Sequence, residues 1–371
     1  MKENLRHAAG SLLVAGLGGA ELTNLERAWL KLVRPAGIIL FRRNIEDARQ
    51  TRALLGEATE LCAAHSFRCV DVEGGTVDRL RDALAPMPSA QAVAQAAKRA
   101  GETELIREHG ELIARGVKAF GFNTTLAPVL DLALPASAAV LGTRAAAATA
   151  AGVVEYARPF LAGLARHGVA GCGKHFPGLG GGALDSHLET PAIRRSGGEL
   201  WREDLAPYRE LRGELPMVMV SHAAYPDTPG KDRPASVSTY WITTVLRKRI
   251  GYRGIVFSDD LEMGGILRFM PIEEAAVAAI RAGMDLLEIC HSPELILTAF
   301  EALIAESERS PAFSRLLMGR AAQTARQRAK LFAGAVPVAL SARKFEALRA
   351  RILRFGETVE KAQPAAEAQP A

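Results

Sequence analysis

Cysteine and the larger aromatic residues are scarce in this chain of 371 residues. The four cysteines lie far apart and no two have C-x2-C spacing, so we expect buried free thiols and neither a disulfide framework nor a zinc site. Three tryptophans and five tyrosines offer little to stack nucleic-acid bases. We therefore interpret the Lys- and Arg-rich stretch 315–354 as a solvated helix face, despite a net charge of +5, and expect no nucleic-acid partner.

Long apolar runs are missing as well. No segment approaches the roughly 20 apolar residues of a membrane helix, so we expect no membrane partner. The N-terminal sequence MKENLRHAAGSLLVAGLGG has basic residues before a short apolar run, but Gly-Gly-Ala-Glu follows where a signal peptide would need a longer apolar region. The run SLLVAGL predicts a buried first strand instead, and we expect a cytoplasmic protein.

What the chain does have is a regular alternation of short apolar runs with longer stretches of helical periodicity, such as 90–116, 145–167 and 239–250. Continuous apolar strands separated by helices indicate parallel pairing. Eight of them at this length predict an α/β fold, a (β/α)8 TIM barrel. The predicted strands are Leu12–Leu17, Gly37–Phe41, Cys69–Val72, Thr125–Leu130, Val169–Lys174, Met217–Ser221, Gly254–Ser258 and Asp285–Cys290.

One domain accounts for most of the chain. We expect residues 1–355 to form the barrel with a C-terminal helical segment that runs from Pro293 to about Phe355. Residues 356–371 are rich in Ala, Pro, Gln and Glu and have little to bury, which predicts a disordered tail.

Polar residues follow the predicted strands, where a TIM barrel builds its active site. The third strand is followed by a segment from Asp71 to Arg79, and the fifth by one from Lys174 to His187. Ser221-His222, Ser258-Asp259-Asp260 and Cys290-His291 follow the last three strands. These groups are predicted to meet at one mouth.

The seventh strand ends in two carboxylates. A carboxylate at the barrel mouth can attack an electrophilic carbon and form a covalent intermediate, and we assign this role to Asp259. An aspartate there can also cap the next helix or form an ion pair, which is the favoured interpretation for Asp260.

The loop after the fifth strand carries a second candidate group. Its glycines and Pro177 leave it free of bulky side chains, so it could close over a substrate. Asp185 and His187 lie two residues apart, and the carboxylate could orient the imidazole for proton transfer. We interpret His187 as an acid/base supported by Asp185.

A metal site at the same mouth is an alternative, because His175, His187, His222 and His291 could converge there. No H-x-H follows the first strand and no H-E-x-x-H occurs, so no metal is expected. The glycines at 178–182 lack the G-K-[ST] ending of a phosphate-binding loop. No cofactor is expected.

At these residues the sequence resembles glycoside hydrolase family 3, specifically its single-domain bacterial β-N-acetylglucosaminidases, from about Ser11 to Glu294. The resemblance rests on LLVAGLGGAEL, GIILFRRNI, DVEGGTVDRL, LAPVLDL, GKHFPGLG…DSHLETP, VMVSHAAYP, DRPASVS, GYRGIVFSDDLEM and AGMDLLEICHSPE, in the family's order. The pair formed by K-H-F-P-G…D-S-H and S-D-D-L-x-M is highly specific. The resemblance implies a TIM barrel that hydrolyses terminal N-acetyl-β-D-glucosamine.

Residue roles carried over from the family agree with those assigned from the chain. The resemblance implies that Asp259 is the nucleophile and His187 the acid/base oriented by Asp185. It implies a sugar-binding role for Asp71. Further substrate contacts fall on Arg79, Arg144, Lys174 and His175.

Three positions depart from the family's patterns. Leu179 stands where K-H-F-P-G-H-G has its second histidine, and Thr76 stands where D-x-E-G-G-R has arginine. The G-[DE]-R-[SA]-F segment reads Leu141-Gly-Thr-Arg144-Ala145, so Thr143 replaces the acidic residue. None of them removes an assigned catalytic residue, but they bear on how firmly the loops are held.

The resemblance implies a retaining double displacement on a muropeptide that carries N-acetylglucosamine on 1,6-anhydro-N-acetylmuramic acid, in a bacterial cytoplasm. A phosphorylase on the same scaffold is an alternative, because a histidine acid/base does not repel phosphate as a carboxylate would. A barrel that binds muropeptides without turnover is a second alternative. We expect a carbohydrate as the partner and a monomer or weak dimer.

Overall fold

The computed structural model describes residues 2–182, 190–231, 233–333 and 339–362. Asp185 and His187 lie outside these ranges, so the predictions for them concern residues that the structure does not describe. In the described part of the chain, no helix is both long enough and apolar enough to cross a membrane.

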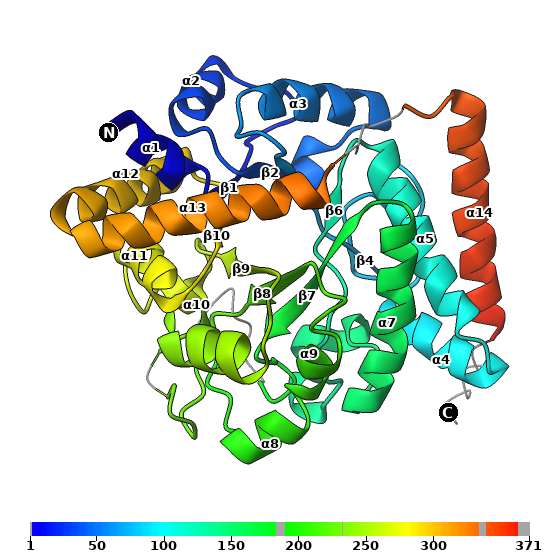
Figure 1. The fold of residues 1–371 in the computed structure, drawn as a ribbon. Helices are drawn as coiled ribbons and strands as arrows, with labels where there is room; N and C mark the ends of the chain where they lie inside the picture. The colour runs from blue at the N-terminus through cyan, green and yellow to red at the C-terminus, as the bar shows by residue number, and fades with distance from the viewer. Residues whose placement is uncertain (1, 183–189, 232, 334–338, 363–371) are drawn as a thin grey trace.

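Eight parallel strands close into a barrel in the order β1-β10-β9-β8-β7-β6-β3-β2 (Figure 1). This confirms the predicted (β/α)8 architecture. The strands are β1 (Leu13–Gly16), β2 (Gly37–Leu40), β3 (Phe67–Val70), β6 (Thr124–Thr125), β7 (Ala170–Phe176), β8 (Met217–Val220), β9 (Ile255–Asp260) and β10 (Leu286–Ile289).

Two strand predictions needed correction. The fourth strand was predicted over Thr125–Leu130, but β6 covers only two residues because Pro128 has no N–H to donate to a ladder. Backbone pairing nevertheless continues irregularly, with the Leu130 amide donating to the Lys174 carbonyl at 2.6 Å. Val72 does not end the third barrel strand; it begins β4 (Val72–Gly74), which pairs antiparallel with β5 (Val77–Asp78).

The helices surround the barrel. The predicted helix 90–116 is two helices, because Gly101 adopts the left-handed conformation (φ 67°) that ends the first of them. The helices of four or more residues are α1 (Lys2–Gly10), α2 (Asn24–Val33), α3 (Ala48–Glu60), α4 (Ala90–Ala100), α5 (Glu104–Ala119), α6 (Ala138–Leu141), α7 (Ala150–Arg166), α8 (Gly197–Arg202), α9 (Ala206–Glu210), η5 (Tyr240–Arg249), α10 (Gly264–Leu267), α11 (Ile272–Ala282), α12 (Pro293–Arg309), α13 (Pro311–Leu331) and α14 (Ala342–Lys361).

The last helix extends beyond the predicted domain boundary. We expected a disordered tail from residue 356, but α14 continues to Lys361 and packs against α4 and α5 (Figure 1). Its apolar side chains Leu348, Ile352, Phe355 and Val359 are buried at helical spacing. The buried Val359 gives residues 356–361 a packing partner that their composition alone did not predict.

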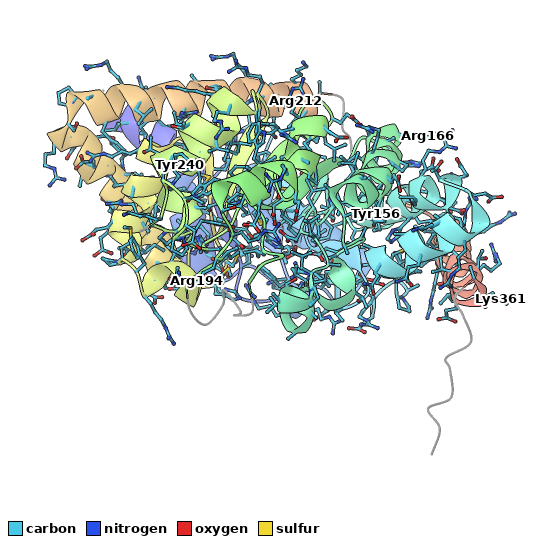
Figure 2. The ribbon with its side chains drawn as sticks, turned by 90° about the horizontal axis from the view of Figure 1, so that it is seen from below. Tyr156, Arg166, Arg194, Arg212, Tyr240 and Lys361 are labelled. Atoms are coloured by element: carbon cyan, nitrogen blue, oxygen red, sulfur yellow. The ribbon has the colours of Figure 1, made fainter. Side chains whose placement is uncertain are left out.

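Buried apolar residues form two layers. One lies between the barrel and its helices, and the other fills the barrel interior with alternate residues of the strands. All four cysteines are free and buried, as predicted. Charged side chains such as Arg166, Arg212 and Lys361 lie at the periphery, whereas Tyr156 lies inside (Figure 2).

The end of α13 closes the N-terminal end of the barrel. Phe332 belongs to the interior cluster and its ring meets that of Phe67 edge-on, with centroids 5.1 Å apart. The Arg328 side chain is 2% exposed and donates a hydrogen bond to the Ala36 carbonyl at 3.0 Å. The carboxyl ends of the strands are therefore the end left open to a substrate.

Candidate active site

A cavity of about 480 Å³ lies at the carboxyl ends of the barrel strands. Six residues predicted for the site line it together, namely Asp71, Arg79, Arg144, Lys174, His175 and Asp259. Its other lining residues are Phe41, Arg42, Arg43, Glu73, Val77, Leu126, Val140, Leu179, Met219, Asp260, Met263, Glu288, Cys290 and His291. These side chains come from seven different strand ends or the loops after them, as expected when a barrel brings its strand ends together.

One side of the cavity is a network of opposite charges, which we call the paired wall: Asp71, Glu73, Arg144 and Lys174. The Lys174 Nζ lies 2.8 Å from Asp71 and 2.6 Å from Glu73. Arg144 donates two hydrogen bonds to Glu73, at 2.8 and 2.9 Å. Because these groups form hydrogen bonds and ion pairs with one another, the wall presents donors and acceptors in fixed positions to a ligand in the cavity.

The pKa values in the paired wall follow from these contacts. Burial alone would raise the pKa of Glu73, but Arg144 and Lys174 outweigh it and hold that pKa well below its usual range. Burial alone would lower the pKa of Lys174, yet Asp71 and Glu73 raise it above its ordinary value. Both residues are therefore charged when the cavity is empty.

His175 is fixed by a carboxylate that the sequence analysis missed. Asp131 is 1% exposed, and its Oδ2 lies 2.7 Å from the His175 Nδ1. It also accepts the backbone amide of Leu179 at 2.7 Å. With the Nδ1 proton directed to Asp131, the Nε2 atom of His175 can accept from Arg144, which lies 3.4 Å away.

Arg79 lines the cavity between Asp71 and Phe41. Its guanidinium is 3.9 Å from the Asp71 carboxylate, and its carbon Cζ lies 5.8 Å from the centre of the Phe41 ring. The Arg79 amide donates to the Asp71 carbonyl at 3.0 Å. This contact and the β4–β5 hairpin hold Arg79 beside Asp71.

Asp259 lies at the end of β9, at the base of the cavity. Burial would raise the pKa of its carboxyl, but the nearby His175 and His222, with the Asp260 amide, outweigh burial and lower that pKa. The Asp260 amide donates to the Asp259 Oδ1 at 3.0 Å. A carboxylate kept ionised and turned into a cavity can act as a nucleophile.

The side formed by β9 and β10 carries four carboxyl groups, which we call the acidic wall: Asp259, Asp260, Glu262 and Glu288. Burial, followed by the charges of Glu262 and Asp259, raises the pKa of Asp260 to about 7. Burial also raises the pKa of Glu288, with the charges of Asp260, Asp71 and Asp259 acting in the same direction. Within the described chain, no lysine or arginine forms an ion pair with any of the four.

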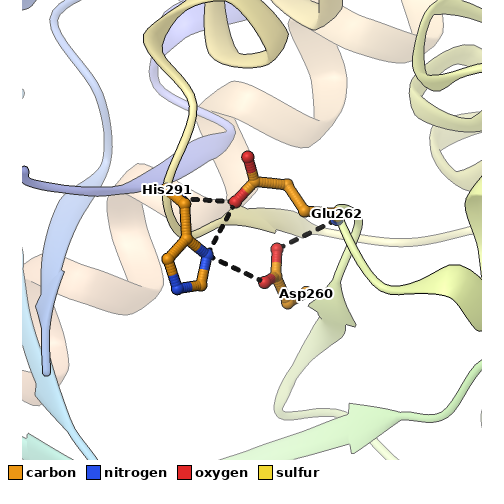
Figure 3. Close-up of side chains that lie close together, drawn as sticks. All are labelled: Asp260, Glu262 and His291. Carbon is orange, nitrogen blue, oxygen red and sulfur yellow. Dashed lines mark hydrogen bonds and ion pairs between the residues drawn. The ribbon is translucent and has the colours of Figure 1, made fainter. Parts of the chain in front are cut away.

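His291 lies at the rim of the acidic wall and contacts two of its members (Figure 3). Its Nδ1 lies 3.0 Å from Glu262 and 3.7 Å from Asp260. Glu262 also accepts the backbone amides of Cys290 at 2.9 Å and Ser292 at 2.7 Å. The cluster therefore ties the end of β9 to the loop that leads into α12.

Among the described residues, Asp260, Glu262 and His291 are also the group whose ligand atoms could hold a metal ion, since these atoms lie within 4.8 Å of one another. The other two described histidines among the candidate ligands have different partners. His175 contacts Asp131, and His222 contacts Ser236 at 2.8 Å and the Asp260 carbonyl at 2.9 Å.

The three departures from the family pattern leave this arrangement intact. The exposed Thr76 and Thr143 lie outside the network that holds Arg144. Leu179 is 7% exposed and packs in the core, while its backbone amide binds Asp131. The loop after β7 is thus anchored through its main chain at the position where the family has a histidine.

Fold and site together define a carbohydrate-cleaving type of barrel, with a carboxylate nucleophile candidate facing a wall of cations and acceptors. The model of the glycosyl hydrolase family 3 N-terminal domain matches residues 5–314. The chain therefore belongs to glycosyl hydrolase family 3.

Curated relatives named β-hexosaminidase are similar to most of this chain. A β-hexosaminidase of Alkalilimnicola ehrlichii is 39% identical over 287 residues, which cover 76% of this chain and 82% of that protein. A β-hexosaminidase of Methylococcus capsulatus is 39% identical over 288 residues, covering 77% of this chain and 85% of that protein.

Two solved structures superpose on most of this chain. The family 3 β-N-acetylglucosaminidase from Paenibacillus sp. superposes with a TM-score of 0.84 at 32% identity, covering 95% of this chain and 68% of that one. NagZ from Neisseria gonorrhoeae, solved in complex with N-trifluoroacetyl-D-glucosamine, superposes with a TM-score of 0.75 at 30% identity, covering 93% and 98%.

Proposed function

We propose that this β-hexosaminidase-type glycoside hydrolase removes terminal, non-reducing N-acetyl-β-D-glucosamine with retention of configuration. The observation that carries the proposal is Asp259, an ionised carboxylate at the base of a cavity whose other side is the paired wall. In the first step, its carboxylate attacks the anomeric carbon and forms a glycosyl-enzyme ester. In the second, water cleaves that ester and releases the sugar.

The paired wall supplies the positioning that such an attack requires. A sugar ring offers hydroxyl groups that donate to carboxylates and accept from ammonium and guanidinium groups. Asp71 and Arg144 are fixed by Lys174 and Glu73 before the substrate arrives, so little ordering is left to the bound state. We propose that Asp71, Arg79, Arg144, Lys174 and His175 hold the terminal sugar.

Proton transfer is assigned to His187, with Asp185 orienting its imidazole. The assignment rests on the D-S-H motif. Of the described residues on either side of this motif, Leu179 lines the cavity, and the Thr190 hydroxyl donates to the Gly265 carbonyl, two residues after the lining residue Met263. His187 would protonate the leaving oxygen in the first step and activate water in the second.

The natural substrate proposed is a muropeptide with N-acetylglucosamine on 1,6-anhydro-N-acetylmuramic acid. The support comes from the family motifs and from the likeness to NagZ. Recycling of imported cell-wall fragments would place the enzyme in the bacterial cytoplasm.

The test is hydrolysis of 4-nitrophenyl N-acetyl-β-D-glucosaminide by the wild type, Asp259→Ala and His187→Ala, with and without azide and phosphate. We expect turnover by the wild type, near-complete loss in Asp259→Ala and partial rescue of His187→Ala by azide. Full activity of Asp259→Ala would refute the nucleophile. Release that requires phosphate would identify a phosphorylase, and binding without turnover would identify a non-catalytic barrel.

A further inference from the structure

Glu288 is a buried carboxyl group in the cavity that takes no part in the proposed reaction. On β10 it lies between Leu286 and Cys290, two members of the barrel-interior cluster. Because side chains alternate along a strand, Glu288 points into the interior as they do. It is 3% exposed and lines the same cavity as Asp71 and Asp259.

The two oxygens of this carboxyl group differ in their contacts. Oε1 accepts a hydrogen bond from the Cys290 Sγ at 3.2 Å. Burial raises the pKa of the Cys290 thiol, which therefore keeps its proton and acts as the donor. Oε2 is fully buried and has no hydrogen-bond partner in the described part of the chain.

These contacts locate the proton of the neutral acid. Because the carbonyl oxygen of a carboxylic acid is the better acceptor, we assign Oε1, which accepts from the thiol, as the carbonyl oxygen and place the hydrogen on Oε2. The O–H group then lacks an acceptor, which is unfavourable for a buried donor. A small shift of the carboxyl group toward an acceptor in the cavity would remove this penalty.

We propose that protonated Glu288 is a sugar-contacting residue, whose Oε2–H donates a hydrogen bond to a hydroxyl group of the terminal sugar. A hydroxyl fits this position because it accepts from Glu288 and passes its own hydrogen to a neighbouring carboxylate of the cavity, Asp71 or Asp259. An acetamido oxygen could only accept. This inference rests on the proposed function, since it takes the sugar bound next to Asp259 as the ligand.

Two variants separate this role from a structural one. Glu288→Gln keeps the shape, with the amide oxygen toward Cys290 and the NH2 group donating in place of Oε2–H. Glu288→Leu fills a similar volume and removes the donor. Their kcat/KM values would be measured on 4-nitrophenyl N-acetyl-β-D-glucosaminide and on its 3-, 4- and 6-deoxy analogues.

We expect Glu288→Leu to lower kcat/KM on the parent substrate about tenfold, as loss of one buried hydrogen bond does. In the wild type and Glu288→Gln, one deoxy analogue should be slower than the parent by more than that factor, because it loses both the bond from Glu288 and the bond to the neighbouring carboxylate. In Glu288→Leu this penalty should shrink about tenfold, because only the bond to the carboxylate is left to lose. Thermal unfolding of both variants would confirm that they are folded.

Unchanged deoxy penalties at all three positions in Glu288→Leu would overturn the proposal, because the carboxyl would then contact no hydroxyl. Failure of the proposed function has a different signature, in which the wild type hydrolyses neither the parent nor any analogue. In that case calorimetric binding of N-acetylglucosamine and its deoxy analogues to wild type and Glu288→Leu decides the role of Glu288.

Discussion

Glu73 and Glu288 are both 3% exposed and line the same cavity, yet their surroundings move the pKa of each carboxyl in opposite directions. Glu73 lies in the paired wall, where Arg144 and Lys174 contact it. Glu288 lies in the acidic wall, where its neighbours are carboxyl groups and a thiol. Burial alone does not decide the charge of a side chain; the partners that share its burial do.

The paired wall and the acidic wall suit different roles in the site. Ionised, mutually paired groups suit the holding of hydroxyls, because their geometry is set before binding. In the described part of the chain no lysine or arginine forms an ion pair with the acidic wall, and the pKa values of Asp260 and Glu288 are raised, while His175 and His222 help to lower the pKa of Asp259. One cavity thus contains a carboxylate able to attack and a carboxylic acid able to donate.

The largest effect is expected within the acidic wall. Asp259→Asn and Glu288→Gln are the same chemical change, from acid to amide, at two residues of one cavity. We expect Asp259→Asn to lower kcat by about a thousandfold or more, because an amide cannot serve as the nucleophile. Glu288→Gln should stay within a few-fold of the wild type. Equal losses of kcat in the two variants, measured in steady-state assays, would contradict the different roles assigned to Asp259 and Glu288.

The next largest effect is expected from a substitution that removes the ion pairs of the paired wall. Lys174→Met leaves Asp71 and Glu73 buried without their shared cation, and removal of one partner from a buried ion pair costs about 3–5 kcal/mol. We expect a loss of this size in the free energy of unfolding, measured in urea at neutral pH. The control is Lys31→Met at an exposed helix position, where about 0.5 kcal/mol or less is expected. Similar values for both variants would show that the network contributes little.

A milder substitution tests whether the geometry of the bonds in the paired wall matters apart from their charge. Arg144→Lys keeps the positive charge but cannot make the two parallel bonds to Glu73. We expect KM to rise about tenfold while the free energy of unfolding falls by about 1–2 kcal/mol. A variant with unchanged KM would place Arg144 outside substrate binding.

The smallest effect concerns pH. The folded-state pKa of Asp260, raised to about 7, lies above the usual value for aspartate, so the folded protein binds this proton more tightly than the unfolded chain. Its contribution to stability is therefore lost as pH rises from about 4 to 7. We expect Asp260→Asn to raise the unfolding temperature at pH 8, relative to wild type, by about 2 °C more than at pH 4.5. Asp82→Asn, at an exposed carboxyl, is the control and should show no such difference.

Much of this architecture could be predicted from the sequence. The eight strands and the residues that follow them are visible as apolar runs with polar ends, and a closed barrel brings those ends together. Helix ends were harder, because Gly101 ends a helix through its φ angle whereas Gly356 lies inside one. The two cases differ in the φ angle of the glycine, which the residue type alone does not reveal.

The supporting carboxyls of the site were not predicted, for different physical reasons. Asp131 holds His175 from a loop 44 residues earlier, so no local pattern connects them. Glu288 lies within an apolar strand, and a single charged residue there does not reveal which side of the strand faces the cavity. The charge of Glu288 depends on its tertiary neighbours, which spacing along the chain does not encode.

The closure of the barrel by Phe332 and Arg328 bears on where this protein can be cut. The family match ends at residue 314, within the first turn of α13. A chain truncated there would lose the aromatic ring that covers Phe67 and the guanidinium that binds the Ala36 carbonyl. Water would then reach the apolar interior from the end opposite the catalytic mouth. We propose that the smallest independently folding unit includes the whole of α13 and Phe332. The folding unit therefore extends beyond residue 314, where the match to the family model ends.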